Sequence, residues 1–262
     1  MTRIAFESYD DSLAAYRSGA FQFNTVIAVP NIHMENFFEV SIPKYGEAPI
    51  SVSGIGDGFV DLTIRPVGKV TNEVFEYYVG DTLLMRGPYG NGFDLEHYKG
   101  KELVIIAGGT GVSPVRGVIS YFTEHKDERK DMTLIAGFKS VRDILFKADF
   151  EQWRQKMHMI LTLDSGEETV EHKIGLVTKY IPDLKLAEVS KAVAIVVGPP
   201  AMMRFSVKGL LERDFKEENI WISHERKMCY GLGKCGHCKV NDTYICLDGP
   251  VFNYTKGKTL ID

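Results

Sequence analysis

Apolar residues in the first third of the chain form short runs separated by turn residues. Between about residues 36 and 87 the runs are FFEVSIP, PISVS, FVDLTIRPVG and TLLMRG, with glycines between them. Short strands with closely spaced turns are typical of an antiparallel sheet or barrel. Residues 1–99 are therefore predicted to form a small antiparallel barrel.

From residue 101 onward, apolar runs alternate with helical patterns. After the run ELVIIA, residues Val115, Val118, Ile119 and Phe122 recur at the spacing of an amphipathic helix. Further helices are expected around 149–156 and 202–215. The strands expected between them are 102–107, 132–138, 157–164, 192–198 and 219–225. This alternation predicts a doubly wound parallel sheet.

Three parts follow from these patterns. The barrel (1–99) precedes an α/β domain of the nucleotide-binding type (100–225). The last part, residues 226–262, is short, rich in cysteine and glycine, and belongs to neither pattern.

Composition narrows the class of protein. The formal charge is −4 and 44% of residues are hydrophobic, which predicts a globular chain without the basic stripe of a nucleic-acid binder. No run approaches the roughly 18 apolar residues that span a bilayer, so no membrane partner is expected. The N-terminus lacks the pattern of a secretory signal, which predicts a cytoplasmic protein with reduced thiols.

The segment IAGGTGVSPVRG follows the first strand of the α/β domain. Glycines there permit a tight turn, and the N-terminus of the next helix favours a phosphate. The segment lacks the Gly-Lys-Ser/Thr of a nucleotide-hydrolysing loop, and Pro114 takes the last place of a G-x-G-x-x-G pattern. A purely structural turn is the alternative. The segment VVGPPAMM ends another strand and is expected to form a second wall of the same crevice.

Three barrel segments carry candidate binding groups. EAPISVSG places Ser51 and Ser53 on one face of a strand, and GPYGNGF offers Tyr89 and Phe93 as flat apolar surfaces. In RPVGKVT a glycine turn is followed by Thr71, whose hydroxyl could bind a pyrophosphate together with backbone N–H groups. Each segment alone is also compatible with an ordinary turn.

In this order, the barrel and the α/β domain resemble the ferredoxin–NADP reductase superfamily, which implies a flavin (FAD) site and a pyridine-nucleotide site. By this resemblance the flavin-ring strand corresponds to Pro49, Ile50 and Ser51, and the flavin pyrophosphate turn to Gly68, Lys69, Val70 and Thr71. The nucleotide loop corresponds to Gly108, Gly109, Thr110 and Gly111, and the nicotinamide-side turn to Gly198, Pro199 and Pro200. No residue is assigned a catalytic role.

The chain departs from the family pattern in the barrel and in the nicotinamide-side turn, where the usual Cys-Gly reads Val197-Gly198. The usual Arg-x-Tyr-Ser reads Ala48-Pro49-Ile50-Ser51, so the phosphate-pairing arginine is missing and Arg65, Lys69 or Arg86 would have to replace it. The segment FNTVIAVPNIHMENFFEV also leaves little room for the first two strands of the barrel.

All four cysteines, Cys229, Cys235, Cys238 and Cys246, lie in one short segment with the spacing C-x5-C-x2-C-x7-C. Plant-type [2Fe–2S] sites use C-x4-C-x2-C and a further cysteine, whereas a zinc ribbon needs two C-x2-C pairs. Iron–sulfur is the preferred reading, with zinc and free thiols as alternatives. The usual spacing places the first ligand at Tyr230, one residue after Cys229, so a shift of the glycine-rich loop is required for Cys229 to bind.

Flavin chemistry connects these sites, because a flavin accepts two electrons from a nicotinamide and releases them singly to a cluster. The segments YGEAPISVS, RPVGKVT, GPYGNGF, GGTGVSPVRG, VVGPPAMM and GKCGHCKVNDTYICLDGPVFNY together resemble the anaerobic sulfite reductase B family most closely. This resemblance implies NADH oxidation by FAD, transfer to a [2Fe–2S] cluster, and delivery to partner subunits that carry iron–sulfur centres and sirohaem and reduce sulfite to sulfide.

Three alternatives remain open. Electron-transfer subunits of dihydroorotate dehydrogenase and sulfhydrogenase gamma subunits share the layout. A zinc-bearing scaffold on a degenerate reductase fold is the non-enzyme alternative. Lys139 and Arg142 could bind an adenosine 2′-phosphate, so the choice of NADH over NADPH rests on the resemblance alone.

Overall fold

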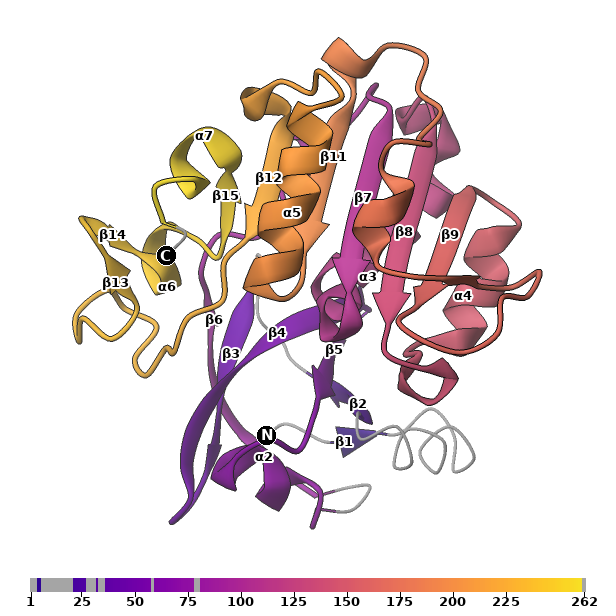
Figure 1. The fold of residues 1–262 in the computed structure, drawn as a ribbon. Coiled ribbons are helices and arrows are strands. Elements are labelled where there is room, and N and C mark those ends of the chain that lie inside the picture. Colours follow the sequence, from indigo (N-terminus) through magenta and orange to yellow (C-terminus); the bar gives the residue numbers. More distant parts are fainter. Residues whose placement is uncertain are drawn as a thin grey trace. The chain divides into compact units, whose positions relative to one another are not determined.

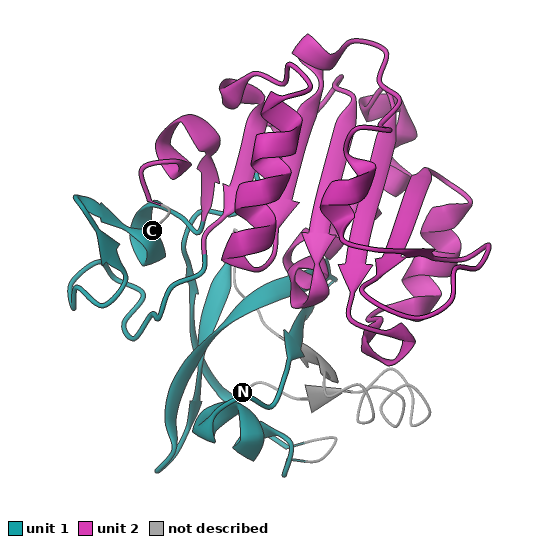
Figure 2. Ribbon diagram, in the orientation of Figure 1, with its two compact units in different colours: residues 1–93, 225–250 teal, residues 94–224, 251–262 magenta. Residues whose placement is uncertain are grey.

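The computed structural model describes residues 4–5, 21–26, 32, 36–57, 59–77 and 81–260. It divides into two compact units (Figures 1 and 2). Unit 1 contains Met1–Phe93 and Glu225–Pro250, and unit 2 contains Asp94–His224 and Val251–Asp262. The cysteine segment thus groups with the N-terminal sheet. The three-part division at about 99 and 225 remains a prediction of how separately the parts fold.

An antiparallel sheet of six strands forms most of unit 1, as predicted. Its order is β1 (Ile4–Ala5), β2 (Phe21–Val26), β5 (Phe59–Ile64), β4 (Gly46–Gly56), β3 (Phe37–Ile42) and β6 (Leu84–Tyr89). The expectation that the chain has little room for two early strands was wrong, because FNTV lies within β2 and β2 pairs with β5 along its whole length.

The core of unit 1 lies on one face of this sheet. Alternate residues of β3, namely Phe38, Val40 and Ile42, are buried together with Val70 and Val74 of the short helix α2 (Lys69–Val74). Because strand side chains alternate in direction, Phe37, Glu39 and Ser41 lie on the opposite face of β3. That opposite face carries the contacts to the cysteine segment.

A seven-stranded sheet forms unit 2. Its order is β10 (Lys173–Ile174), β9 (His158–Leu163), β8 (Met132–Phe138), β7 (Leu103–Gly108), β11 (Val193–Val197), β12 (Ile220–Ser223) and β15 (Val251–Asn253). All neighbouring pairs are parallel except β12 and β15. Every residue of β7 is buried, as expected for a central strand covered on both faces.

Helices connect these strands and pack on the sheet. The longer ones are α3 (Val112–Glu124), α4 (Lys147–Arg154) and α5 (Pro200–Leu211), at the positions where the sequence predicts them. The single-turn 3-10 helices are η1 (Leu95–His97), η2 (Gly109–Gly111), η3 (Lys126–Glu128), η4 (Val141–Asp143), η5 (Val177–Tyr180), η6 (Val189–Lys191) and η7 (Glu217–Asn219). Among the described residues, no helix combines the length and apolar character needed to cross a membrane.

The C-terminal segment contains small elements only. The hairpin of β13 (Lys239–Val240) and β14 (Thr243–Tyr244) is followed by α6 (Ile245–Asp248), all in unit 1. The chain then enters unit 2, where β15 extends the sheet and α7 (Tyr254–Gly257) follows. The sequence did not predict that residues beyond 250 join the parallel sheet, since VFN is too short to show a periodicity.

Candidate functional site

The predicted nucleotide loop is a glycine turn between β7 and α3. Gly109 has φ +56°, a conformation that favours glycine, and η2 leads directly into α3. A Cβ on Gly111 would lie 2.5 Å from the carbonyl oxygen of Val197, so only glycine permits this approach. The loop therefore lies against the end of β11, as the sequence predicts for two walls of one crevice.

The second wall is the turn Gly198-Pro199 at the start of α5. Gly198 has φ +156°, and a Cβ there would lie 3.1 Å from the backbone nitrogen of Gly108. Neither α3 nor α5 has a side-chain cap at its N-terminus. The N–H groups of Val112 and Met203 already donate to the carbonyls of Gly109 and Pro199, and Pro114 and Pro200 carry none, so only the remaining first-turn N–H groups could bind an anionic ligand.

Met202 lies between these two turns, and no sequence motif marks it as a binding residue. A Cβ on Gly108 would lie 2.4 Å from its sulfur, and a Cβ on Gly198 would lie 2.8 Å from its Cε. The thioether thus fills the space between the two turns. Only the chain's fold reveals this, because Met202 looks like any apolar residue of an amphipathic helix.

In unit 1 the predicted flavin strand is the middle of β4. Pro49, Ile50 and Ser51 are half-buried and pair with Glu39, Phe38 and Phe37 of β3. Ile50 packs against the core of unit 1, whereas Pro49 and Ser51 share the opposite face with Glu39. The assignment of these three residues to flavin binding remains a prediction.

The predicted pyrophosphate turn is closed by Thr71. Its hydroxyl accepts from the backbone N–H groups of Val67 (3.1 Å) and Gly68 (2.9 Å) and donates to the Gly68 carbonyl (3.2 Å). Thr71 therefore shapes the turn from within. The side chains of Lys69 and Arg65 are exposed and are the cations nearest to this turn in the sequence.

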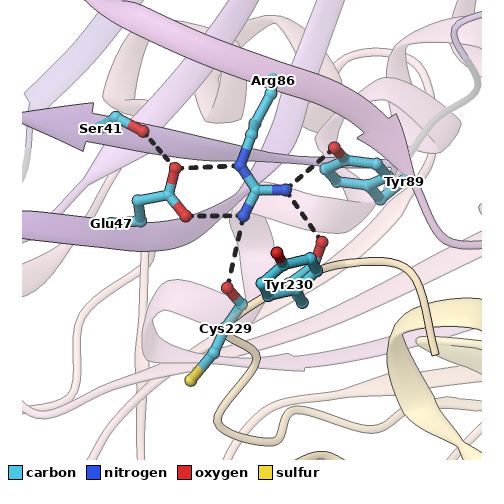
Figure 3. A network of polar contacts seen from close by, with 6 residues as sticks. All are labelled: Ser41, Glu47, Arg86, Tyr89, Cys229 and Tyr230. Carbon is cyan, nitrogen blue, oxygen red and sulfur yellow. Dashed lines mark hydrogen bonds and ion pairs between the residues drawn. The ribbon is translucent and has the colours of Figure 1, made fainter. Parts of the chain in front are cut away.

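Arg86 has a different role from the phosphate pairing considered for it. It forms a two-pronged ion pair with Glu47, from Nε to Oε1 (2.9 Å) and from Nη2 to Oε2 (2.6 Å), as Figure 3 shows. Ser41 donates to the same carboxylate at 2.6 Å. Hydrogen bonds from Arg86 and Ser41 lower the pKa of Glu47 to about 2. Glu47 also raises the pKa of the Arg86 guanidinium.

The same guanidinium binds the start of the cysteine segment. Nη1 donates to the carbonyl oxygen of Tyr230 (2.9 Å) and to the Tyr89 hydroxyl (3.1 Å), and Nη2 donates to the carbonyl oxygen of Cys229 (3.3 Å). The rings of Tyr89 and Tyr230 lie 5.6 Å and 5.5 Å from the guanidinium carbon. We call Arg86, Glu47, Ser41 and Tyr89 with these two carbonyls the Arg86 network.

Tyr89 also contacts the cysteine segment directly. A Cβ on Gly231 would lie 2.5 Å from the Tyr89 ring, and Gly231 has φ +73°, so both sterics and conformation require glycine. Tyr89 packs on Phe37 with ring centroids 5.7 Å apart. The predicted flat apolar surface of Tyr89 is thus covered in part by the cysteine segment.

Three of the four cysteines interact. Cys238 and Cys246 are buried, and the sulfur of Cys246 accepts from the Gly233 N–H (3.4 Å) while that of Cys238 accepts from the Cys246 N–H (3.5 Å). Burial, together with a hydrogen bond between the Cys246 thiol and Cys238, raises the pKa of the Cys246 thiol to about 11, and Cys235 contributes electrostatically. Cys235 itself is exposed.

Cys229 is held by its backbone carbonyl, which accepts from Arg86. Figure 3 shows its sulfur pointing away from Arg86, while its carbonyl oxygen points toward the guanidinium. Across the described part of the chain, no three His, Cys, Asp or Glu side chains converge as a metal site. The complete ligand set Cys229, Cys235, Cys238 and Cys246 therefore stays a prediction.

The donor set nevertheless fits an iron–sulfur cluster. Thiol sulfurs that accept backbone N–H groups are the environment such clusters use. Gly231, Gly233 and Gly236 all have positive φ, which gives the loop the curvature to wrap a ligand. A zinc ribbon uses two C-x2-C pairs, and this segment contains one.

Comparisons with known proteins agree with this reading. Residues 105–208 match the oxidoreductase NAD-binding domain, and residues 225–256 match the iron–sulfur cluster binding domain of dihydroorotate dehydrogenase B. The gamma subunit of sulfhydrogenase 1 from Pyrococcus furiosus is 36% identical over 83% of this chain and 78% of its own length. A probable dihydroorotate dehydrogenase B electron transfer subunit from the same organism is 30% identical over 86% of this chain and 80% of its own length.

Solved structures show the same fold. The structure of an NADH-dependent reduced ferredoxin–NADP oxidoreductase has a TM-score of 0.74 with 21% identity, covering 93% of this chain and 88% of that chain. A ferredoxin NADP+ reductase from Neisseria gonorrhoeae has a TM-score of 0.69 with 13% identity, covering 84% of this chain and 96% of that chain. The cofactors of this layout are NAD, FAD and a [2Fe–2S] cluster. The chain belongs to the family of NAD-binding flavoprotein electron-transfer subunits with a C-terminal iron–sulfur domain, which includes the sulfhydrogenase gamma and dihydroorotate dehydrogenase B subunits.

Proposed function

We propose that the chain oxidises NADH through FAD and a [2Fe–2S] cluster and delivers the electrons to partner subunits that reduce sulfite to sulfide. The single observation that supports the electron path is the Arg86 network, which ties the start of the cysteine segment to the sheet that carries the predicted flavin strand. The choice of sulfite rests on the combination of six sequence segments that resembles the anaerobic sulfite reductase B family.

The residues of unit 2 would bind the dinucleotide. The turn Gly108–Gly111 and the turn Gly198-Pro199 present backbone N–H groups at two helix N-termini, suited to a pyrophosphate and its neighbours. The Met202 thioether lies between the two turns. We assign these positions to NADH, in line with the family resemblance.

The residues of unit 1 would bind the other two cofactors. Pro49, Ile50 and Ser51 would contact the flavin ring, and the turn Gly68–Thr71 with Arg65 would hold its pyrophosphate. Cys229, Cys235, Cys238 and Cys246 would bind the cluster, with the Gly233 and Cys246 N–H groups orienting two sulfurs. When bound, the flavin converts the two-electron donation of a nicotinamide into single-electron steps that a cluster can accept.

The identity of the electron acceptor is the most specific part of the proposed function. Its partners would carry further iron–sulfur centres and sirohaem, because sulfite reduction needs several electrons at one centre. The sulfhydrogenase relatives support a second candidate, in which this chain serves a hydrogenase, and the dihydroorotate dehydrogenase relatives support a third.

Purification of the chain with its native partners under anaerobic conditions distinguishes these candidates. We expect NADH oxidation by the complex to depend on sulfite and to yield sulfide. NADH oxidation that depends on elemental sulfur or protons would instead identify a hydrogenase as the partner. Reduction of NAD+ by dihydroorotate would identify a dihydroorotate dehydrogenase as the partner. The isolated chain with a dye serves as the control, since it needs no partner in any of the three cases.

A further inference from the structure

Glu39 carries a buried carboxyl group that has no role in the electron transfer proposed above. It lies in the middle of β3 with 0% of its surface exposed. Neither of its carboxyl oxygens has a hydrogen-bond partner among the described residues. Burial of a carboxylate without a partner strongly disfavours the charged form.

Its position connects the two predicted cofactor regions of unit 1. On one side Glu39 is opposite Pro49 of the flavin strand β4. On the other side it is opposite Arg86 of β6, whose guanidinium binds the start of the cysteine segment. Glu39 is therefore the cross-strand neighbour of both Pro49 and Arg86.

Arg86 cannot satisfy this carboxyl group as it stands. Its five N–H groups are directed to Glu47, Tyr89, Cys229 and Tyr230. Its positive charge is also balanced by the ionised Glu47 at 2.6 Å. The set of Arg86, Glu47 and Glu39 is thus neutral when Glu39 is protonated and carries one negative charge when Glu39 is ionised.

The Glu39 carboxyl group can bind and release a proton near neutral pH. Burial raises its pKa to about 7, with Arg86 acting to lower it and Glu47 acting to raise it. These two are the charged groups that face Glu39 from β6 and β4. A further negative charge nearby would favour the protonated form, because opposite changes in charge compensate each other across a region of low dielectric.

We propose that Glu39 takes up one proton from solvent when the iron–sulfur site gains an electron, and releases it when the electron leaves to the partner. The step balances: carboxylate, proton, oxidised cluster and one electron give carboxylic acid and reduced cluster, and the electron comes from NADH by way of the flavin. The inference rests on the proposed cluster ligands. Glu39 is a positioning residue in this scheme, because it acts through charge and does not touch the cluster.

The test is the pH dependence of the cluster's midpoint potential in the full-length chain, followed by electron paramagnetic resonance during chemical reduction. In the wild type we expect the potential to fall as pH rises from about 6 to about 8, approaching about 59 mV per tenfold change in proton concentration for one proton per electron. In Glu39→Gln we expect no such dependence. Glu128→Gln in unit 2 is the matched control and should keep the dependence, because hydrogen bonds from Tyr121 and Lys99 lower the pKa of Glu128 and it lies outside the Arg86 network.

A pH-independent potential in the wild type, or an equal dependence in wild type and Glu39→Gln, would overturn the proposal. Redox-difference infrared spectra of the wild type, with and without carbon-13 glutamate, give a second readout if Glu39→Gln does not hold its cluster. Reduction should produce a labelled carboxylic-acid band, and its absence contradicts proton uptake. A chain without an iron–sulfur signal contradicts the proposed function instead, so the two failures are distinguishable.

Discussion

Arg86 of β6 donates a hydrogen bond to the carbonyl oxygen of Cys229, the first cysteine of the C-terminal segment. The next carbonyl, that of Tyr230, accepts from the same guanidinium at 2.9 Å. Two consecutive carbonyls are thus held by one side chain whose own orientation is fixed by Glu47. The start of the cysteine segment is consequently positioned by the sheet of unit 1 as well as by its own glycines.

Replacing Arg86 should loosen this segment. Arg86→Gln removes both carbonyl contacts and the ion pair. Arg86→Lys keeps the positive charge but loses the planar guanidinium that binds Glu47 through two N–H groups. Since the pair is about one-third exposed, we expect a loss of only on the order of 1 kcal/mol in the free energy of unfolding, measured with urea. Iron per chain should fall in both variants, more in Gln than in Lys. Unchanged iron content and spectra in Arg86→Gln would remove Arg86 from this role.

The first cluster ligand can be tested through the register of the loop. Cys235→Ser should abolish the cluster's visible absorption, because the C-x2-C pair is then broken. If Cys229 is a ligand, Cys229→Ser should also lose iron, and the double variant Cys229→Ser with Tyr230→Cys, which restores the common spacing, should regain it. Full iron content in Cys229→Ser alone would show that Cys229 does not bind the cluster.

The predicted nucleotide site depends on the close approach of Gly111 to Val197. Gly111→Ala places a methyl group 2.5 Å from the Val197 carbonyl oxygen, so the two turns must separate. We expect about 1–3 kcal/mol of lost stability or binding, seen as a raised KM for NADH in dye reduction. Gly209→Ala in α5 is the matched control, since its Cβ would have ordinary contacts at 3.4 Å with Ile181. Equal kinetics in both variants would contradict the assignment of this crevice.

Glu39 should also leave a signature in the pH dependence of stability. Its pKa is about 7 in the folded chain against 4.5 for a free carboxyl, so the folded state holds the proton more tightly. The resulting stabilisation is complete below about pH 4.5 and is lost as pH rises through about 7, amounting to about 3 kcal/mol. Relative to Glu39→Gln, the wild type should therefore lose stability over this window. Parallel unfolding profiles would show that Glu39 does not titrate there.

Sequence patterns predicted the antiparallel sheet and the parallel sheet that follows it, because hydrophobic periodicity and turn residues are local features. The glycines at 109, 111 and 198 were recognisable for the same reason, since each marks a turn after an apolar run. The partners of Arg86 were not, because β6 and the cysteine segment are more than 140 residues apart and only the fold brings them together. Glu47 and Glu39 escaped notice likewise, as a strand's register decides which carboxyl group faces an arginine and which is left buried.

Anaerobic addition of NADH to the purified chain, with flavin, iron, zinc and acid-labile sulfide measured on the same sample, tests the electron path most directly. We expect flavin together with iron and sulfide in the ratio of one [2Fe–2S] cluster, and the bleaching of both chromophores by NADH. Zinc without iron or acid-labile sulfide, in a colourless chain that NADH leaves unchanged, would contradict it.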